Sequence, residues 1–360
     1  MFLIRRRSGR VRTQQFGYTI IELMIAITIS LIILASLVSI FANNSRTRAE
    51  IERANQQTEN GRYALQLITD DLHNAGYLAE FNPAQLPTPP AKPDPCDISV
   101  AGLNTALPIA VQGYDNGAGA PGCLGIDIRA GTDILVVRHA SACAVGPGCD
   151  PNPGLGNAYF QASGCNNTAN STELASGNVA SFYVLDTNPA SFTLHKKDCV
   201  TLANQYQYQT HIYFVANNDN ENPPDGIPTL KRAELGLTGT GNTFSIVPLV
   251  EGVENLQIEY GLDTSVPTAG TPAVYNANPD TYVPCAASPI TCWQNTVAAK
   301  INVLTRNTTT TQGYVDAKVY TLGLNADGTV NTVGPFNDAY KRHTNESVVK
   351  LNNPAGRNSP

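Results

Sequence analysis

The sequence predicts an α+β protein in which a long N-terminal helix packs on an antiparallel β-sheet. Residues 18–41 form an uninterrupted apolar segment, and an amphipathic helical pattern continues from there to residue 76. Short runs of β-branched and aromatic residues then alternate with Gly, Asn and Pro loops. Such runs are typical of antiparallel strands joined by long insertions. The 360 residues suffice for one large domain or two small ones.

The apolar segment is long enough to cross a membrane. From Tyr18 to Phe41 it has no Pro or Gly, and Glu22 is its only charged residue. A helix of 24 residues is about 36 Å long, against about 30 Å for the hydrocarbon core of a bilayer. A removed secretory signal has a shorter apolar region and a small-residue cleavage site. We therefore predict that residues 18–41 are the transmembrane half of the helix.

The distribution of charge predicts the orientation of this segment. Residues 1–17 contain no acid and five arginines, Arg5, Arg6, Arg7, Arg10 and Arg12. Without these five, 18 of the 23 basic residues remain against 29 acidic ones, a net charge of -11. Basic residues before a spanning segment favour a cytoplasmic N-terminus, with the rest of the chain across the membrane. A body this acidic disfavours nonspecific binding of nucleic acid.

The helix is expected to continue beyond the membrane as an amphipathic half over residues 42–76. Small and apolar residues recur at spacings of three and four, at Ile51, Ala54, Thr58, Gly61, Leu65, Ile68, Leu72 and Ala75. The expected polar face carries Arg53, Gln57, Asn60, Gln66 and Asp70. This spacing indicates a helix laid against a domain, and Gly76 is a natural C-terminal stop.

Residues 77–360 are expected to form the globular α+β domain. Six prolines between residues 83 and 95 exclude regular structure there. Six later runs have strand composition, at 133–139, 181–186, 210–216, 244–250, 255–261 and 299–306. The interval from about 83 to 177 reads as a Cys-rich insert without a recognisable pattern.

All eight cysteines follow the apolar segment, which favours disulfides in an oxidising compartment. They are Cys96, Cys123, Cys143, Cys149, Cys165, Cys199, Cys285 and Cys292. Cys143 with Cys149 and Cys285 with Cys292 look like local loop closures, but spacing leaves the full connectivity open. No C-x2-C pair occurs and the histidines do not cluster with the cysteines, so we predict no metal.

Other motifs give weak support for a catalytic or cofactor site. Residues 236–243, GLTGTGNT, resemble a phosphate-binding loop, but Asn242 replaces the lysine and a strand pattern follows. Residues 217–226 offer oxygen ligands without the spacing of a calcium loop, and calcium there stays open. The five histidines are scattered and no G-x-S-x-G occurs. We predict no catalytic residue, no cofactor and no enzymatic activity.

Glu22 is the unusual residue of the apolar segment. An ionised carboxylate in hydrocarbon is unfavourable by several kcal/mol, and such residues usually mark function. If the membrane begins near Ile25, however, Glu22 lies among the lipid headgroups and needs no special role. The residues around it favour the functional reading.

The N-terminus resembles the class III signal of type IV prepilins, a short basic leader that ends in Gly before an apolar helix with Glu at its fifth position. Gly17 would end a leader of residues 1–17, Tyr18 would be the first mature residue and Glu22 the fifth. The family most often has Phe where Tyr18 stands. The resemblance implies cleavage between Gly17 and Tyr18 by prepilin peptidase, then N-methylation of Tyr18.

Three further stretches are similar to minor pilins of the PilW family. They are LITDDLHNAGY at 67–77, LVEGVENLQIEYGLD at 249–263 and DAYKRHTNESVVKLNN at 338–353. The resemblance implies a type IV pilin-like fold, anchored in the bacterial inner membrane with a periplasmic domain. It implies a role in initiating pilus assembly or at the pilus tip, supporting adhesion or twitching motility.

The implied partners are prepilin peptidase, other minor pilins, the major pilin, the inner-membrane pilus assembly machinery and membrane lipid. In such pilins the fifth-position Glu pairs with the N-terminal amine of a neighbouring subunit. Glu22 would then set the register of docking, because a misplaced subunit leaves both charges unpaired in a low dielectric.

Two alternatives stay open at this point. A J-type pseudopilin of type II secretion shares the leader and the general fold, although the stretches at 249–263 and 338–353 favour the PilW family. A membrane-anchored periplasmic enzyme or binding protein would instead keep an uncleaved anchor.

Overall fold

A computed structural model describes residues 17–125, 127–149, 157–167, 173–235, 243–285 and 288–358. The chain divides into one compact unit that ends at Arg53 and a second that begins at Ala54. The basic leader predicted within residues 1–17 lies outside the described residues, except for Gly17. The glycine-rich loop at 236–243 also lies outside them, except for Thr243.

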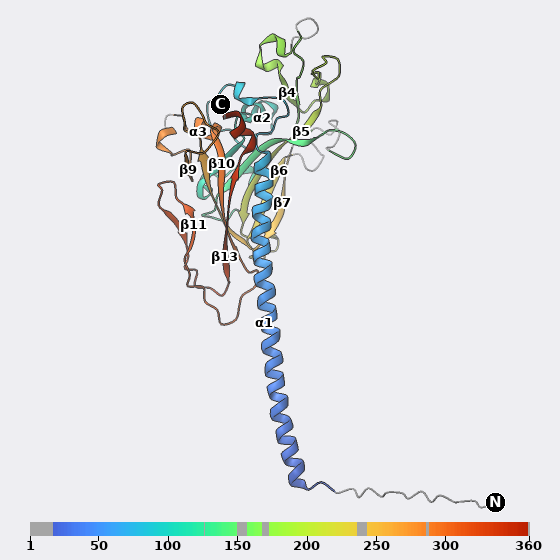
Figure 1. Cartoon of the computed structure of the whole chain (residues 1–360), viewed down its shortest axis with the longest axis vertical. Coiled ribbons are helices and arrows are strands. Elements are labelled where there is room, and N and C mark those ends of the chain that lie inside the picture. Colours follow the sequence, from blue (N-terminus) through green and yellow to red (C-terminus); the bar gives the residue numbers. More distant parts are fainter. Residues whose placement is uncertain are drawn as a thin grey trace, which may run out of the picture. The chain divides into compact units, whose positions relative to one another are not determined.

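Helix α1 runs from Ile20 to Asn74 without interruption and is the long blue helix of Figure 1. By length and composition it can cross a membrane, and its large apolar side chains from Ile20 to Phe41 are exposed. The helix ends because Gly76 takes a left-handed conformation, with φ of 71°. Its N–H donates to the carbonyl of Arg138 at 2.8 Å, so the chain leaves the helix toward the sheet.

The buried face of α1 differs from the predicted stripe. Its described buried residues are Gln57, Gly61, Ala64, Ile68, Asp71 and Leu72. Ala54 and Thr58, which we placed on that stripe, are exposed. Gln57 is buried because its amide donates to two backbone carbonyls, at 2.8 and 2.9 Å. Two satisfied hydrogen bonds make a polar residue compatible with a buried face, and a search for apolar periodicity misses it.

The first sheet is antiparallel and contains seven strands. These are β1 (Val111–Tyr114), β2 (Ile134–Ala144), β3 (Tyr159–Ala162), β4 (Tyr183–Asp186), β5 (Gln205–Ala216), β6 (Thr229–Leu235) and β7 (Phe244–Glu251). Their order is β1-β2-β5-β3-β4, and β6 pairs with both β5 and β7. Strand β5 is therefore central, because it pairs with β2 along its length, with β3 near its start and with β6 near its end.

The second sheet has four strands in the order β13-β10-β8-β9. These are β8 (Val253–Leu262), β9 (Val274–Asn276), β10 (Thr296–Arg306) and β13 (Arg342–Lys350). A separate pair is formed by β11 (Tyr320–Leu324) and β12 (Val330–Val333). The short helices are α2 (Val100–Ala106), α3 (Pro289–Gln294) and α4 (Asn352–Asn358). The predicted α+β fold, a long helix with antiparallel sheets, is confirmed.

Each of the six predicted strand runs contributes to a strand, namely β2, β4, β5, β7, β8 and β10. The strands that sequence reasoning missed lack an apolar run. Strand β6 carries Lys231, Arg232 and Glu234, whose charges are satisfied by ion pairs. Strand β13 is mostly polar because it lies at a sheet edge and one of its faces is exposed.

One buried cluster joins the second half of α1 to both sheets. Its members include Ala64, Ile68, Leu72, Val137, Tyr213, Ile258 and Ile301. The approach of helix and sheet is close at Gly61, where a Cβ atom would stand 2.2 Å from the Asn345 side chain. Glycine at this position therefore allows α1 to seat against β13.

The eight cysteines form four disulfides. They join Cys96 to Cys123, Cys143 to Cys149, Cys165 to Cys199, and Cys285 to Cys292. Two of these close loops of six and seven residues, and the other two join positions 27 and 34 residues apart. Cross-links of this kind limit the freedom of the unfolded chain where loops dominate.

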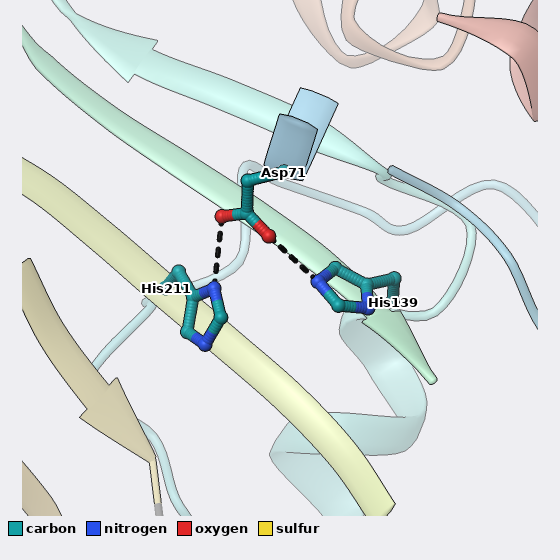
Figure 2. Close-up of side chains that lie close together, drawn as sticks. All are labelled: Asp71, His139 and His211. Carbon is teal, nitrogen blue, oxygen red and sulfur yellow. Dashed lines mark hydrogen bonds and ion pairs between the residues drawn. The ribbon is translucent and has the colours of Figure 1, made fainter. Parts of the chain in front are cut away.

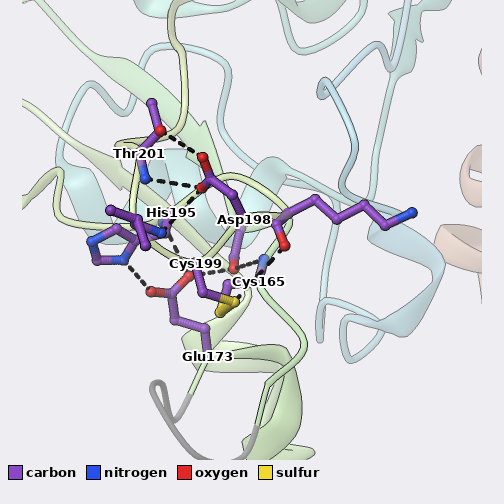
Figure 3. Close-up of a disulfide and its surroundings, with 9 residues drawn as sticks. Cys165, Glu173, His195, Asp198, Cys199 and Thr201 are labelled. Atoms are coloured by element: carbon purple, nitrogen blue, oxygen red, sulfur yellow. Dashed lines mark hydrogen bonds and ion pairs between the residues drawn. A yellow bond between two sulfur atoms is a disulfide. The ribbon is translucent and has the colours of Figure 1, made fainter.

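The Cys165–Cys199 disulfide lies in a locally ordered loop region (Figure 3). The Glu173 carboxylate accepts hydrogen bonds from the Nδ1 and backbone N–H of His195, at 2.7 and 3.1 Å. Asp198 accepts from the N–H and hydroxyl of Thr201, at 2.9 and 2.6 Å. These contacts stabilise the loops beside the disulfide.

Candidate functional site

Gly17 and Tyr18, the residues at the predicted cleavage point, precede the helix in non-helical backbone. Tyr18 is 91% exposed. A Cβ atom added to Gly17 would meet no atom within 4 Å, so the described fold does not itself require glycine there. If glycine is required at this position, the requirement comes from outside the folded chain.

Glu22 forms a reciprocal cap with Thr19 at the start of α1. Its carboxylate accepts from the Thr19 N–H and hydroxyl, both at 2.9 Å. The Thr19 hydroxyl in turn accepts from the Glu22 N–H at 3.3 Å. This is a capping box, and the T-x-x-E spacing that encodes it was present in the sequence but missed. In a single chain Glu22 therefore satisfies donors at the helix start, in addition to any role in assembly.

A second site joins α1 to the first sheet through Asp71, His139 and His211 (Figure 2). Strands β2 and β5 pair with Val137 opposite His211. His139 lies two residues beyond Val137, so both imidazoles are on the same face of the sheet. The Asp71 carboxylate lies between them, 2.8 Å from His139 Nε2 and 2.8 Å from His211 Nδ1. All three residues are buried.

This cluster corrects our reading of the histidines as scattered. Pairing of β2 with β5 brings together two residues that are 72 positions apart, and α1 adds the carboxylate. Two histidines and a carboxylate are also ligand types that transition metals accept. The 2.8 Å separations, however, are those of direct hydrogen bonds, which place protons between the ligand atoms. We therefore assign the cluster as a hydrogen-bonded ion pair.

The geometry defines the charge of His139. Its Nδ1 lies 2.9 Å from the Ala140 carbonyl and its Nε2 faces Asp71, so both ring nitrogens face oxygen acceptors. Only the imidazolium donates from both nitrogens. Burial alone would lower the pKa of His139, but the hydrogen bond to Asp71 and its charge raise that pKa above the usual 6.5. Burial would likewise raise the pKa of Asp71, and the two imidazoles hold it well below 3.8.

We expect the contribution of His139 to stability to decrease as pH rises. A pKa that is raised in the folded state gives a contribution that is complete below about pH 6.5 and lost above the folded pKa. His139→Gln keeps one donor for Asp71 without titrating. The difference in unfolding free energy between wild type and His139→Gln should therefore narrow as the pH rises from about 6 through the raised folded pKa of His139.

Chemical denaturation of both proteins across this range measures that difference. Asp133, whose pKa burial raises to about 8, gives a pH dependence of the same sign. Asp133 is present in both proteins, so its contribution cancels in the difference between wild type and His139→Gln. Tyr213, beside the cluster, has a pKa raised well above 10 by burial and stays neutral. A difference that does not change with pH would contradict an imidazolium at His139.

A third group of charges unites the two later stretches that resemble the PilW family. Arg342 lies in the stretch 338–353, and its guanidinium donates to Glu254, which lies in the stretch 249–263. The same guanidinium also donates to Asp316 at 2.9 Å and to Asp338 at 2.7 Å. The side chains of Arg342 and Asp316 are 0% exposed, and that of Glu254 is 3% exposed. Arg129 adds a second cation at 3.0 Å from Glu254. This ionic cluster ties β8 and β13 to the loop between β10 and β11.

Gly252 forms the sharp connection between β7 and β8 within the same stretch. Its φ is 78°, and a Cβ atom there would stand 2.6 Å from the Arg306 carbonyl oxygen. The Gly252 carbonyl accepts from the Arg306 N–H at 2.8 Å. The turn therefore holds β8 against β10 and places Glu254 in the ionic cluster.

Comparisons with known proteins agree with these features. Residues 212–353 match the family described as Type IV Pilus-assembly protein W. Residues 12–38 match the prokaryotic N-terminal methylation motif. A search of curated proteins found no match. A type IV-like pilin of known structure from Thermus thermophilus is 14% identical, and the alignment covers 41% of this chain and 66% of that one. Its TM-score of 0.23 is too low to bear on the fold.

The methylation motif encloses Gly17, Tyr18 and Glu22 at the start of a helix that leads into an α+β domain. These features define a type IV pilin. The second match contains both Glu254 and Arg342, and so the whole contact between the two later stretches. The two matches together support a type IV pilin of the PilW family.

Proposed function

We propose that this minor pilin of type IV pilus assembly is cleaved between Gly17 and Tyr18, methylated at Tyr18, and docked into the pilus or its priming complex through Glu22. The segment from Gly17 to Glu22 carries the proposal. The fold does not demand glycine at position 17, yet glycine is the residue that a peptidase needs where the backbone must approach closely. Prepilin peptidase and other pilins are the partners that the motif implies.

We further propose that residues 18–41 lie in the inner membrane, with the N-terminus cytoplasmic and residues 42–76 and 77–360 periplasmic. The five arginines before Gly17 support this orientation. The four disulfides support an oxidising compartment for the domain. The role is structural, and initiation of assembly or a place at the pilus tip would support adhesion or twitching motility.

Docking through Glu22 must compete with its cap. Within the described part of the chain, the Glu22 carboxylate accepts from neutral donors of Thr19. Cleavage after Gly17 creates an amine at Tyr18, and a charged donor from a neighbouring subunit gives a stronger hydrogen bond than a neutral one. In a low dielectric the pairing of two charges also removes the penalty of leaving each alone. Assembly is thus expected to replace an internal cap by an intermolecular ion pair.

Variants at Gly17 and Glu22 test the two steps separately. Gly17→Val should leave the leader attached and the protein in the membrane, because a side chain obstructs the peptidase. Glu22→Ala should be cleaved, since its cleavage point is unchanged, but should be absent from sheared pili and from crosslinks to other pilins. Intact mass measures cleavage, and quantitative immunoblotting of sheared pili measures assembly.

Glu22→Gln separates charge from capping. Glutamine also serves in a capping box, so this variant keeps the acceptor for Thr19 and loses only the charge. Failure of Glu22→Gln to assemble, equal to that of Glu22→Ala, supports ion-pair docking. Wild-type assembly of Glu22→Gln would show that capping alone explains the carboxylate. Crosslinked partners from type II secretion in place of pilus components would favour the J-type pseudopilin.

A further inference from the structure

A cavity of about 200 Å³ lies beside the C-terminal helix α4, within the second unit. Four segments line it: the proline-rich loop after α1, the residues before β1, the end of α3, and α4. One part of the wall is apolar and consists mainly of Pro83, Leu86, Pro108 and Pro354. The polar part contains Thr88, Gln294, Asn295 and Arg357, and none of the described residues that line the cavity is acidic.

Arg357 is a cation without an acidic partner among the described residues. Its Nε donates to the Asn353 carbonyl at 3.1 Å, and the remaining nitrogens have no protein acceptor in the described chain. Burial lowers the pKa of Arg357 to about 10, so the guanidinium stays charged at neutral pH. Glu80 lines an adjoining cavity that Arg357 also borders, but it forms no ion pair with it. Arg357 is half-buried, and a charge in that position without a counter-charge among the described residues is unfavourable, which points to a missing anion.

Helix dipoles do not supply the missing charge. The C-terminus of α1 lies beside Arg357, but its carbonyls carry only partial charge. The carbonyls of Asn74 and Ala75 already accept from the Asn353 amide, at 3.4 and 3.1 Å. A Cβ atom at Gly76 would stand 2.6 Å from Arg357 Nη2. Glycine at the helix end therefore leaves space for the guanidinium as well as stopping the helix.

The other polar groups of the cavity are suited to an anion. The Thr88 hydroxyl donates to Gln294 Oε1 at 3.2 Å, which leaves the Gln294 NH2 group as a donor. Asn295 follows at the end of α3 and adds a second side-chain amide. A water molecule occupies about 30 Å³ of liquid, so the cavity holds a ligand of about six heavy atoms.

We propose that this cavity binds a small organic carboxylate. The guanidinium of Arg357 and the side-chain amides of Gln294 and Asn295 bind the carboxylate, while the apolar part of the cavity wall contacts a short apolar group of the ligand. A guanidinium binds a carboxylate with two parallel hydrogen bonds, and the apolar wall disfavours a fully hydrated anion such as phosphate. The carboxylate belongs either to a free monocarboxylic acid or to a side chain of another pilin subunit. The inference is independent of cleavage and docking at Gly17 and Glu22.

Arginine modification in the full chain, in detergent, tests the site. Phenylglyoxal labelling of Arg357 is followed by mass spectrometry with and without isobutyrate, isobutyramide or phosphate. Isobutyrate should slow labelling of Arg357 several-fold, and isobutyramide, which has the same shape without the charge, should not. Arg62 is the internal control, since its side chain is 72% exposed and pairs only with Glu59 in the described structure. The rate at which Arg62 is labelled should not change with isobutyrate, isobutyramide or phosphate.

Binding of isobutyrate followed by NMR tests the same residue by substitution. Arg357→Gln should weaken the affinity at least about tenfold, and Arg62→Gln should leave it unchanged. If crosslinking to other pilins is intact in Arg357→Gln, the carboxylate comes from a free acid. If those crosslinks are lost in Arg357→Gln, the carboxylate comes from a partner subunit. Equal protection by isobutyramide or phosphate, or unchanged affinity in Arg357→Gln, would overturn the proposal.

Discussion

Replacing Arg342 with methionine is expected to destabilise the domain by about 3 to 5 kcal/mol. The guanidinium donates to Glu254, Asp316 and Asp338, and the first two side chains are almost completely buried. Methionine has a similar volume but leaves these carboxylates without their shared cation. Arg129 and Arg306 remain near Glu254, at 3.0 and 3.5 Å, and do not reach Asp316. The unpaired Asp316 is therefore the main source of the loss.

Denaturant unfolding of the full chain in detergent measures this loss. Arg62→Met is the matched control, because Arg62 forms one exposed ion pair on α1 and its removal should change stability by less than about 1 kcal/mol. The loss of unfolding free energy in Arg342→Lys should lie between those of Arg342→Met and Arg62→Met, since lysine keeps the charge but lacks the planar fork of donors. A loss in Arg342→Met no larger than in Arg62→Met would show that the cluster is not a stabilising centre.

Asp71→Ala is expected to have an effect of similar size, about 3 to 5 kcal/mol near pH 6. The substitution leaves the His139 imidazolium buried without its counter-charge and removes the acceptor of His211. The loss should become smaller at higher pH, because His139 is then neutral in the wild type too. Detachment of α1 from the first sheet is the expected structural result, visible as faster hydrogen exchange in the last turns of the helix.

Asp70→Ala provides the control for this prediction. Asp70 is the preceding residue of α1, has the same side chain and is exposed. Its removal changes the net charge and the helix propensity by the same amounts without touching the buried cluster. If the two alanine variants unfold at the same denaturant concentration, the stabilising role of the Asp71 cluster is wrong.

The sequence by itself determined the features that depend on local composition. Residues 18–41 are apolar without Pro or Gly, which is sufficient to predict a spanning helix from chain geometry. Gly76 predicted the end of α1 because few other residues adopt its left-handed conformation easily. Strands with β-branched, apolar runs, such as β2 and β10, were likewise recognisable. The T-x-x-E cap of Glu22 was equally local and could have been predicted.

Only the tertiary structure decided which polar residues are buried. Gln57 was placed on the solvent face because its side chain is polar, yet its two acceptors come from positions 305 and 341. Asp71 meets His139 and His211 only after β2 and β5 pair in one particular register. The pairing of the cysteines and the isolation of Arg357 likewise depend on segments distant in the chain. A polar group is stable in a core only when a partner is brought to it, and sequence spacing does not contain that partner.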